Sequence, residues 1–229
     1  MTPPHGAHRG PAHPPASTEA PRDCPLCPRL TAYRDRNAAS EPAWFNGAVP
    51  SFGDPAATLL VVGLAPGRTG ANRTGRPFTG DYAGELLYTT LAAHGFVRGR
   101  FGARADDGMA LVGVMVTNAV RCAPPENKPT GAEINACRPF LAARIAALPA
   151  LRAILTLGRI AHDSTVRALG ARPAHHPFGH GAASRLAGMG LYASYHCSRY
   201  NTNTGRLTPA MFDAAMAAAA TSARGDPGG

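Results

Sequence analysis

The chain has 229 residues, 45% of them hydrophobic, which suits one globular α/β domain with tails. It has no run of 18 apolar residues and no apolar signal-peptide core after Met1. We therefore expect a cytosolic protein with no membrane partner. The formal charge of +9 favours a nucleic-acid partner, because basic surfaces attract phosphate backbones.

The chain order predicts a tail, a domain and a second tail. Residues 1–20 are rich in Pro, His and Ala, so we expect them to be disordered. Residues 21–218 form the predicted single domain, and residues 219–229 a flexible C-terminal tail. Apolar runs predict strands at Thr58–Val62, Leu111–Thr117, Ala153–Leu157 and Leu191–Tyr195. Helices are predicted at Gly84–Ala93, Thr130–Ala147, Gly158–Ala168 and Pro209–Ala220, with Thr208 as the last N-cap.

The alternation of strands and helices predicts a three-layer α/β/α fold with a central, mainly parallel four-stranded sheet. In such sheets the ligand crevice lies beyond the carboxyl ends of the strands. Gly63-Leu64-Ala65-Pro66-Gly67 follows the first predicted strand, Asn118 the second and His196 the fourth. We therefore expect these three segments to form one site.

Four cysteines have the pattern of a metal site. Cys24 and Cys27 form a C-x₂-C pair, while Cys122 and Cys137 flank a loop further along the chain. Four thiolates can hold a [4Fe–4S] cluster or a tetrahedral zinc ion, and the spacing does not choose between them. Four unrelated buried thiols are the other interpretation. Cys197, beside His196, is interpreted as a packed thiol and not as a ligand.

Residues 63–84 contain six glycines and allow close backbone approach to a ligand. A P-loop would need Gly-Lys-Ser/Thr at its end, and no lysine occurs here; a Rossmann fingerprint does not fit either. A flexible surface loop remains the simple alternative. Asp81 lies near the end of the segment, where aspartate is also a common turn residue.

Several long motifs nevertheless resemble one family. The sequences G-L-A-P-G and N-R-T-G-R-P-F-T-G-D, at residues 63–67 and 72–81, look like the first motif of the family 5 (B-type) uracil-DNA glycosylases. Residues 195–208 look like their second motif, and residues 117–122 and 137–141 are also similar. The resemblance covers residues 20–215. Cys197 departs from the pattern, because the family usually has proline there.

The resemblance implies a structural [4Fe–4S] cluster held by Cys24, Cys27, Cys122 and Cys137. It also implies that Asp81 is the catalytic carboxylate, because Leu64 replaces the glutamate of the related family 4 motif and neither Leu64 nor Ala65 can act as an acid or base. Asp81 would stabilise the positively charged sugar and orient water. His196 would donate a hydrogen bond to the leaving base.

The remaining site residues are assigned to base and DNA contacts. A flipped base is expected to stack on Phe78 and meet Asn118 with its polar edge, while backbone N–H groups near residues 63–67 aid His196. The predicted base-binding residues are Gly63, Ala65, Gly67, Phe78 and Asn118. The predicted DNA-binding residues follow His196: Arg199, Asn201, Asn203, Thr204 and Arg206. Each of these residue types also occurs in ordinary structural roles, so the assignment depends on the combination of motifs and not on any single residue.

Lys128 is the only lysine, which leaves no obvious amine for a Schiff base and predicts a monofunctional enzyme that leaves an abasic site. The expected substrates are uracil, hypoxanthine and xanthine in double-stranded, or also single-stranded, DNA. We expect a monomer of the bacterial cytosol or nucleoid. The alternatives are an iron–sulfur electron carrier and a zinc-containing nucleic-acid-binding protein without glycosylase activity.

Overall fold

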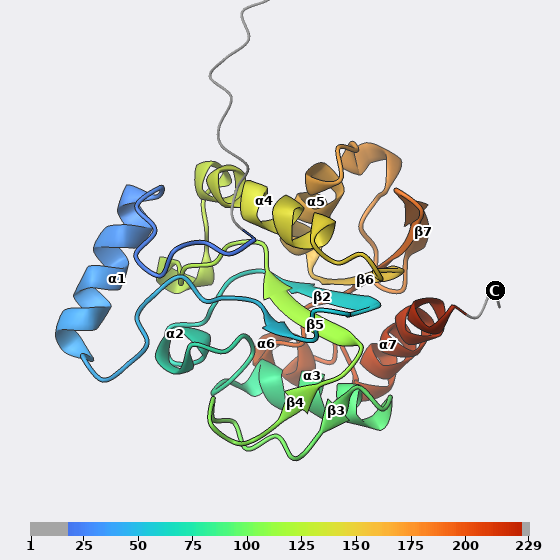
Figure 1. Cartoon of the computed structure of the whole chain (residues 1–229), viewed down its shortest axis with the longest axis horizontal. Coiled ribbons are helices and arrows are strands. Elements are labelled where there is room, and N and C mark those ends of the chain that lie inside the picture. Colours follow the sequence, from blue (N-terminus) through green and yellow to red (C-terminus); the bar gives the residue numbers. More distant parts are fainter. Residues whose placement is uncertain (1–17, 226–229) are drawn as a thin grey trace, which may run out of the picture.

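The computed structural model describes residues 18–225 and has a six-stranded sheet at its centre, in the order β1-β5-β2-β6-β8-β7 (Figure 1). The four inner strands are parallel to one another. They are β2 (Leu59–Gly63), β5 (Val114–Asn118), β6 (Ala153–Leu157) and β8 (Met189–Ser194). These strands correspond to the four apolar runs, so the parallel core of the sheet is confirmed.

The predicted number of four strands was too small. Short strands β1 (Phe52–Gly53) and β7 (Ala183–Leu186) pair antiparallel at the two edges. Strands β3 (Val97–Arg98) and β4 (Ala110–Leu111) form a separate two-stranded sheet. Leu111 belongs to β4 and not to the second inner strand, because Gly113, with φ of 70°, turns the chain between them.

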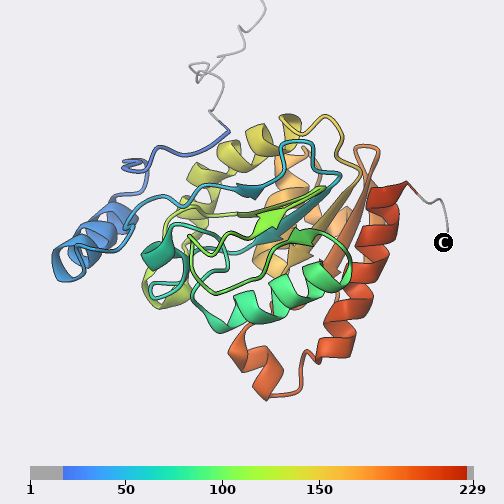
Figure 2. The same ribbon diagram turned by 60° about the horizontal axis from the view of Figure 1, so that its bottom comes forward.

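Helices cover both faces of the sheet (Figures 1 and 2). One face carries α3 (Tyr82–Ala93) and α7 (Pro209–Arg224), and the other carries α4 (Gly131–Ala146) and α5 (Arg159–Ala168). Successive residues of β2 alternate between the two cores, since side chains along a strand point to opposite faces. The three-layer prediction is confirmed, and the four predicted helices are all present.

Three further helices were not predicted. They are α1 (Pro28–Ser40), α2 (Ala71–Thr74) and α6 (Arg199–Asn203), and short 3₁₀ turns occur at Pro125–Asn127 and Pro173–His175. Helix α1 is polar and buries only Leu30 and Asn37. Arg29 on α1 binds Glu133 of α4 at 2.7 and 2.8 Å, which fixes the helix to the domain.

Both predicted tail boundaries need correction. Residues 1–17 lie outside the described part of the chain, but Ala20 is buried and Glu19 forms ion pairs with Arg121 and Arg144 at 3.1 and 2.6 Å. At the other end α7 continues to Arg224 with its alanine face in the core, so the tail does not begin at residue 219. No helix in residues 18–225 has the length and apolarity needed to span a membrane.

Candidate active site

Three predicted site segments meet at the carboxyl edge of the sheet. Gly63, the last residue of β2, pairs in register with Asn118, the last residue of β5. His196 follows β8 two residues after that strand ends. The ends of these parallel strands therefore bring together residues that are far apart in the sequence, as predicted.

Gly63, Phe78 and Asn118 form one wall of the site. A methyl group at Gly63 would lie 2.5 Å from Cζ of Phe78 and would also overlap the Asn118 amide oxygen. Only glycine therefore allows the ring and the amide to pack this closely against the backbone. The Phe78 ring is also stacked on His196, with centroids 5.8 Å apart and planes inclined by 24°.

The Asn118 side chain is only 3% exposed, and its Oδ1 has no hydrogen-bond partner within residues 18–225. Burying an amide oxygen without a partner is costly, and such atoms are rare in folded proteins. An incoming N–H group would satisfy it. The amide is therefore suited to reading the polar edge of a planar ring that stacks on Phe78.

Asp81 has two distinct contacts. It is the N-cap of α3, where Oδ1 accepts a hydrogen bond from the Gly84 N–H at 3.2 Å. Its other oxygen, Oδ2, faces the glycine loop so closely that a methyl group at Gly70 would lie 2.5 Å from it. Burial raises the pKa of Asp81, opposed by the hydrogen bonds from the backbone of Gly84 and Ala83. The cap thus orients a carboxylate toward the loop that was predicted to hold the ligand.

His196 is half-buried at the surface of the site, and burial lowers its pKa to about 4. The imidazole is therefore neutral at pH 7 and can donate one N–H without carrying a charge. Its backbone is fixed by Asn201, whose Nδ2 donates to the His196 carbonyl at 2.8 Å. Cys197 is fully buried in the core beneath α3 and its Sγ lies 3.5 Å from the Ala83 carbonyl, which confirms it as a packed thiol.

The predicted DNA-contacting residues divide into two groups. Arg199, Asn203 and Arg206 are exposed, with Arg199 above the Tyr82 ring and Arg206 4.5 Å above the Tyr195 ring. Asn201 holds the His196 backbone, and the hydroxyl of Thr204 donates to the Tyr200 carbonyl at 2.8 Å. Asn201 and Thr204 therefore also shape the loop itself.

Sequence reasoning missed several residues beside His196. A cavity of about 280 Å³ is lined by Gly158, Arg159, Phe178, Gly179, Tyr195, His196, Asn201 and Arg206. Arg159 lies over the Phe178 ring at 5.3 Å, so the cavity has two cations held on aromatic rings. Tyr200, in α6, is 72% exposed. Its signal was an aromatic residue within a polar run, but the pattern alone did not indicate exposure.

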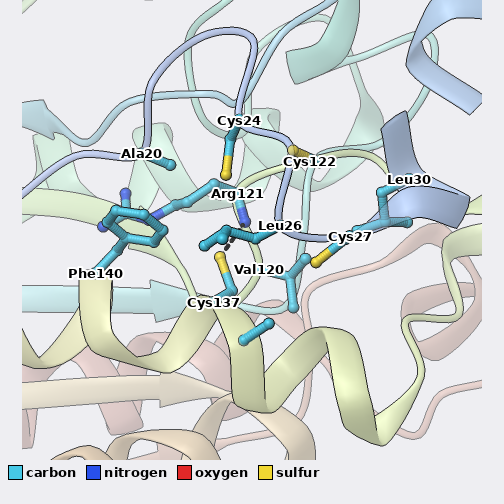
Figure 3. A pocket seen from close by; sticks show the side chains of 11 residues that line it. Ala20, Cys24, Leu26, Cys27, Leu30, Val120, Arg121, Cys122, Cys137 and Phe140 are labelled. Carbon is cyan, nitrogen blue, oxygen red and sulfur yellow. Dashed lines mark hydrogen bonds between the residues drawn. The ribbon is translucent and has the colours of Figure 1, made fainter. Parts of the chain in front are cut away.

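The four predicted metal ligands line a common cavity (Figure 3). Cys24 and Cys27 come from the segment that leads into α1, Cys122 from the loop after β5 and Cys137 from α4. All four are free thiols, and burial raises the pKa of Cys122 to about 12 and of Cys137 to about 11. The backbone N–H of Arg121 donates to Sγ of Cys137 at 3.2 Å.

The donor set fits an iron–sulfur cluster, because four thiolates in an apolar shell are the usual ligands of one. The shell includes Leu26, Leu30, Val120 and Phe140. Within residues 18–225 no three His, Cys, Asp or Glu side chains form a group that could hold a metal ion, so no metal is assigned from geometry. Ala65 packs against this cysteine-lined core, and its predicted contact with a base stays a prediction.

Comparisons with known proteins indicate the family. Residues 50–220 match the model of the uracil DNA glycosylase superfamily. A type-5 uracil-DNA glycosylase of Thermus thermophilus is 48% identical over 196 residues, covering 82% of this chain and 89% of the relative. Type-5 enzymes of Mycobacterium bovis and Pyrobaculum aerophilum are 42% and 41% identical, covering 83% and 81% of this chain and 74% and 83% of theirs.

Proposed function

Because this chain belongs to the type-5 uracil-DNA glycosylases of the uracil DNA glycosylase superfamily, we propose that it hydrolyses the bond between uracil and deoxyribose in DNA. The observation that carries the proposal is that the buried Oδ1 of Asn118, beside the Phe78 ring, has no hydrogen-bond partner in the described part of the chain, residues 18–225. A flipped uracil would stack on that ring and donate its ring N–H to Oδ1, while Nδ2 donates to the adjacent carbonyl.

Bond cleavage builds positive charge on the sugar and negative charge on the departing base. The Asp81 carboxylate, oriented by its cap bond to Gly84, would stabilise the sugar and orient the attacking water. The neutral His196 imidazole would donate to the base oxygen on which negative charge grows, as in an oxyanion hole. Stacking on Phe78 supports this role for His196, because it fixes the plane of the imidazole.

The surface beside His196 suits the DNA backbone. Arg159, Arg199 and Arg206 are exposed cations near the site, and two of them line its open cavity. Guanidinium groups that lie on aromatic rings are held in place and can meet phosphate oxygens. The exposed Tyr200 ring beside them can stack on bases next to the flipped nucleotide.

The direct test is the release of uracil from a labelled duplex that holds one uracil, measured under single-turnover conditions. We expect uracil to be released and an abasic site to remain with its strand uncut. A monofunctional reaction is supported by Lys128, whose side chain is 80% exposed and whose Nζ is paired with Glu126 at 3.2 Å. We further propose that the enzyme acts as a monomer in the cytosol. Absence of uracil release, from both duplex and single strand, would reject the activity.

Hypoxanthine and xanthine are proposed as further substrates. Hypoxanthine presents the same carbonyl and ring N–H to Asn118 as uracil does, whereas cytosine and adenine present the reverse pattern and should be rejected. Leu64 adds no polar group that would select pyrimidines. We expect release of hypoxanthine from matched duplexes, and Asn118→Ala should slow excision of both bases. Full uracil release with no detectable hypoxanthine release would contradict the broad pocket but not the uracil activity.

We also propose that Cys24, Cys27, Cys122 and Cys137 hold a structural [4Fe–4S] cluster. Such a cluster supplies a cross-link, and these cysteines would join the segment before α1 to the loop after β5 and to α4. Support comes from the four free thiols that line one apolar cavity.

Elemental analysis of protein purified without air should find about four irons per chain if the cluster is present. Cys137→Ser should lose most of that iron, because it removes one of four ligands. Cys197→Ser is the matched control and should keep it, since Cys197 packs in a different core. Stoichiometric zinc without iron would contradict the cluster.

A further inference from the structure

Phe78, the residue proposed to stack on the flipped base, has an unusual backbone conformation. Its φ is +52° although it is not glycine, and its ring is only 5% exposed. A residue with a side chain adopts this left-handed region at a cost in free energy, so the surrounding structure must hold it there. The contacts that hold the Phe78 backbone therefore also fix the distance between its ring and Asn118.

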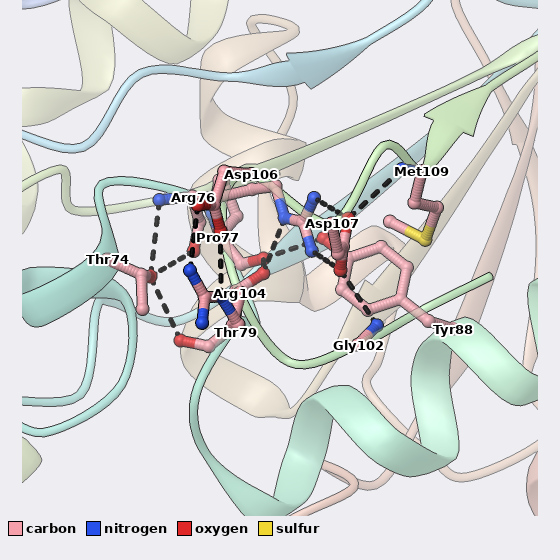
Figure 4. A network of polar contacts seen from close by, with 10 residues as sticks. All are labelled: Thr74, Arg76, Pro77, Thr79, Tyr88, Gly102, Arg104, Asp106, Asp107 and Met109. Atoms are coloured by element: carbon pink, nitrogen blue, oxygen red, sulfur yellow. Dashed lines mark hydrogen bonds and ion pairs between the residues drawn. The ribbon is translucent and has the colours of Figure 1, made fainter. Parts of the chain in front are cut away.

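Buried side chains form hydrogen bonds with Pro77 and Thr79 (Figure 4), which are the residues on either side of Phe78 in the sequence. Arg76 is 4% exposed, and its Nε donates to Oγ1 of Thr79 at 2.8 Å. The hydroxyl of Tyr88 donates to the Pro77 carbonyl at 2.6 Å. These hydrogen bonds hold in place the residues directly before and after Phe78.

Arg76 is itself fixed from a distant part of the chain. Its Nη1 and Nη2 bind Oδ1 and Oδ2 of Asp107, 31 residues away, at 2.8 and 2.6 Å. Asp107 also accepts hydrogen bonds from the N–H groups of Gly102 and Met109, at 2.8 and 3.0 Å. The rings of Phe52, Tyr88 and Phe101 surround the guanidinium at 5.0 to 5.8 Å.

A buried ion pair adds little stability over an apolar pair of similar size, but it can select one conformation. Both side chains are 5% exposed, and all the bonds described above are made to protein groups, so neither side chain is available to DNA. We propose that Arg76 and Asp107 are positioning residues that hold Phe78 in the conformation needed for excision. This inference rests on the proposed glycosylase function.

The test uses Arg76→Lys and Asp107→Asn, which keep volume but lose the two-pronged ion pair. A displacement of about 1 Å at a reacting group can cost about 100-fold in rate, so we expect single-turnover uracil release to fall by about that factor. Affinity for the duplex should stay unchanged, because the exposed cations are not altered. Crystal structures of the variants should show the Phe78 ring displaced.

Two controls separate positioning from simple stability. Arg104→Lys and Asp106→Asn alter an exposed ion pair in the same loop, 2.8 Å long, and should leave the rate unchanged. The double variant Arg76→Met/Asp107→Leu should keep the thermal midpoint but remain slow. The inference would be overturned if folded single variants kept wild-type rates. It would also be overturned if their rates recovered when the variants were cooled below their melting range. A wild-type protein inactive on uracil would instead overturn the proposed function.

Discussion

Replacing Asp81 with asparagine is expected to slow uracil release by about 10²- to 10⁴-fold while leaving helix α3 intact. Asparagine caps helices as well as aspartate does, so its oxygen can keep the bond to the Gly84 N–H. The substitution therefore removes the negative charge that faces the glycine loop, and little else. Single-turnover rates on a uracil duplex, together with the thermal midpoint, would measure both effects.

The pH dependence gives a second readout for Asp81. Burial raises its pKa, so the carboxyl becomes protonated at a higher pH than an ordinary aspartate as the solution is acidified. The wild-type rate should therefore decrease as the pH is lowered past that raised pKa. The pH–rate profile of Asp81→Asn should lack this decrease. Asp106→Asn, at an exposed acid, is the matched control. A normal rate in folded Asp81→Asn would leave Asp81 as a helix cap only.

The inner sheet could be predicted because β2, β5 and β6 are buried on both faces and therefore consist of apolar runs. The edge strands could not, because β1 has two residues and β7 alternates between exposed and half-buried positions. Helix α1 was missed for a related reason. It has a polar sequence, and tertiary contacts such as the Arg29–Glu133 ion pair hold it in place.

The site shows the same limit. Gly63, Asn118 and His196 could be grouped in advance because each follows a predicted strand, and parallel strands end at one edge. The Arg76–Asp107 pair could not be foreseen, because no local pattern links residues 31 positions apart. Ala65 was assigned to the base from its motif, whereas its packing against the cysteine-lined core depends on how α4 and the segment before α1 meet.

The second large effect is expected at His196. Its N–H would stabilise negative charge on the departing base, and one such donor is typically worth about 10²- to 10³-fold in rate. We expect His196→Ala to lower the single-turnover rate by that factor with little change in duplex affinity. His175→Ala, at an exposed histidine, is the control. A change in affinity alone would contradict the leaving-group role.

The lowered pKa of His196 allows a test of whether the neutral or the charged imidazole acts in the reaction. With a pKa of about 4 the imidazole stays neutral from pH 5 to 8, so it should add no limb to the rate in that range. An ordinary histidine would titrate near pH 6.5. The folded protein favours the neutral imidazole, whereas the unfolded chain binds a proton at His196 below about pH 6.5. The free energy of unfolding should therefore decrease as the pH falls from about 6.5 toward about 4. Unfolding curves of wild type and His196→Gln across that pH interval would measure this loss of stability. If the wild-type rate instead changed near pH 6.5, and His196→Gln removed that change, a charged imidazole would be the acting form.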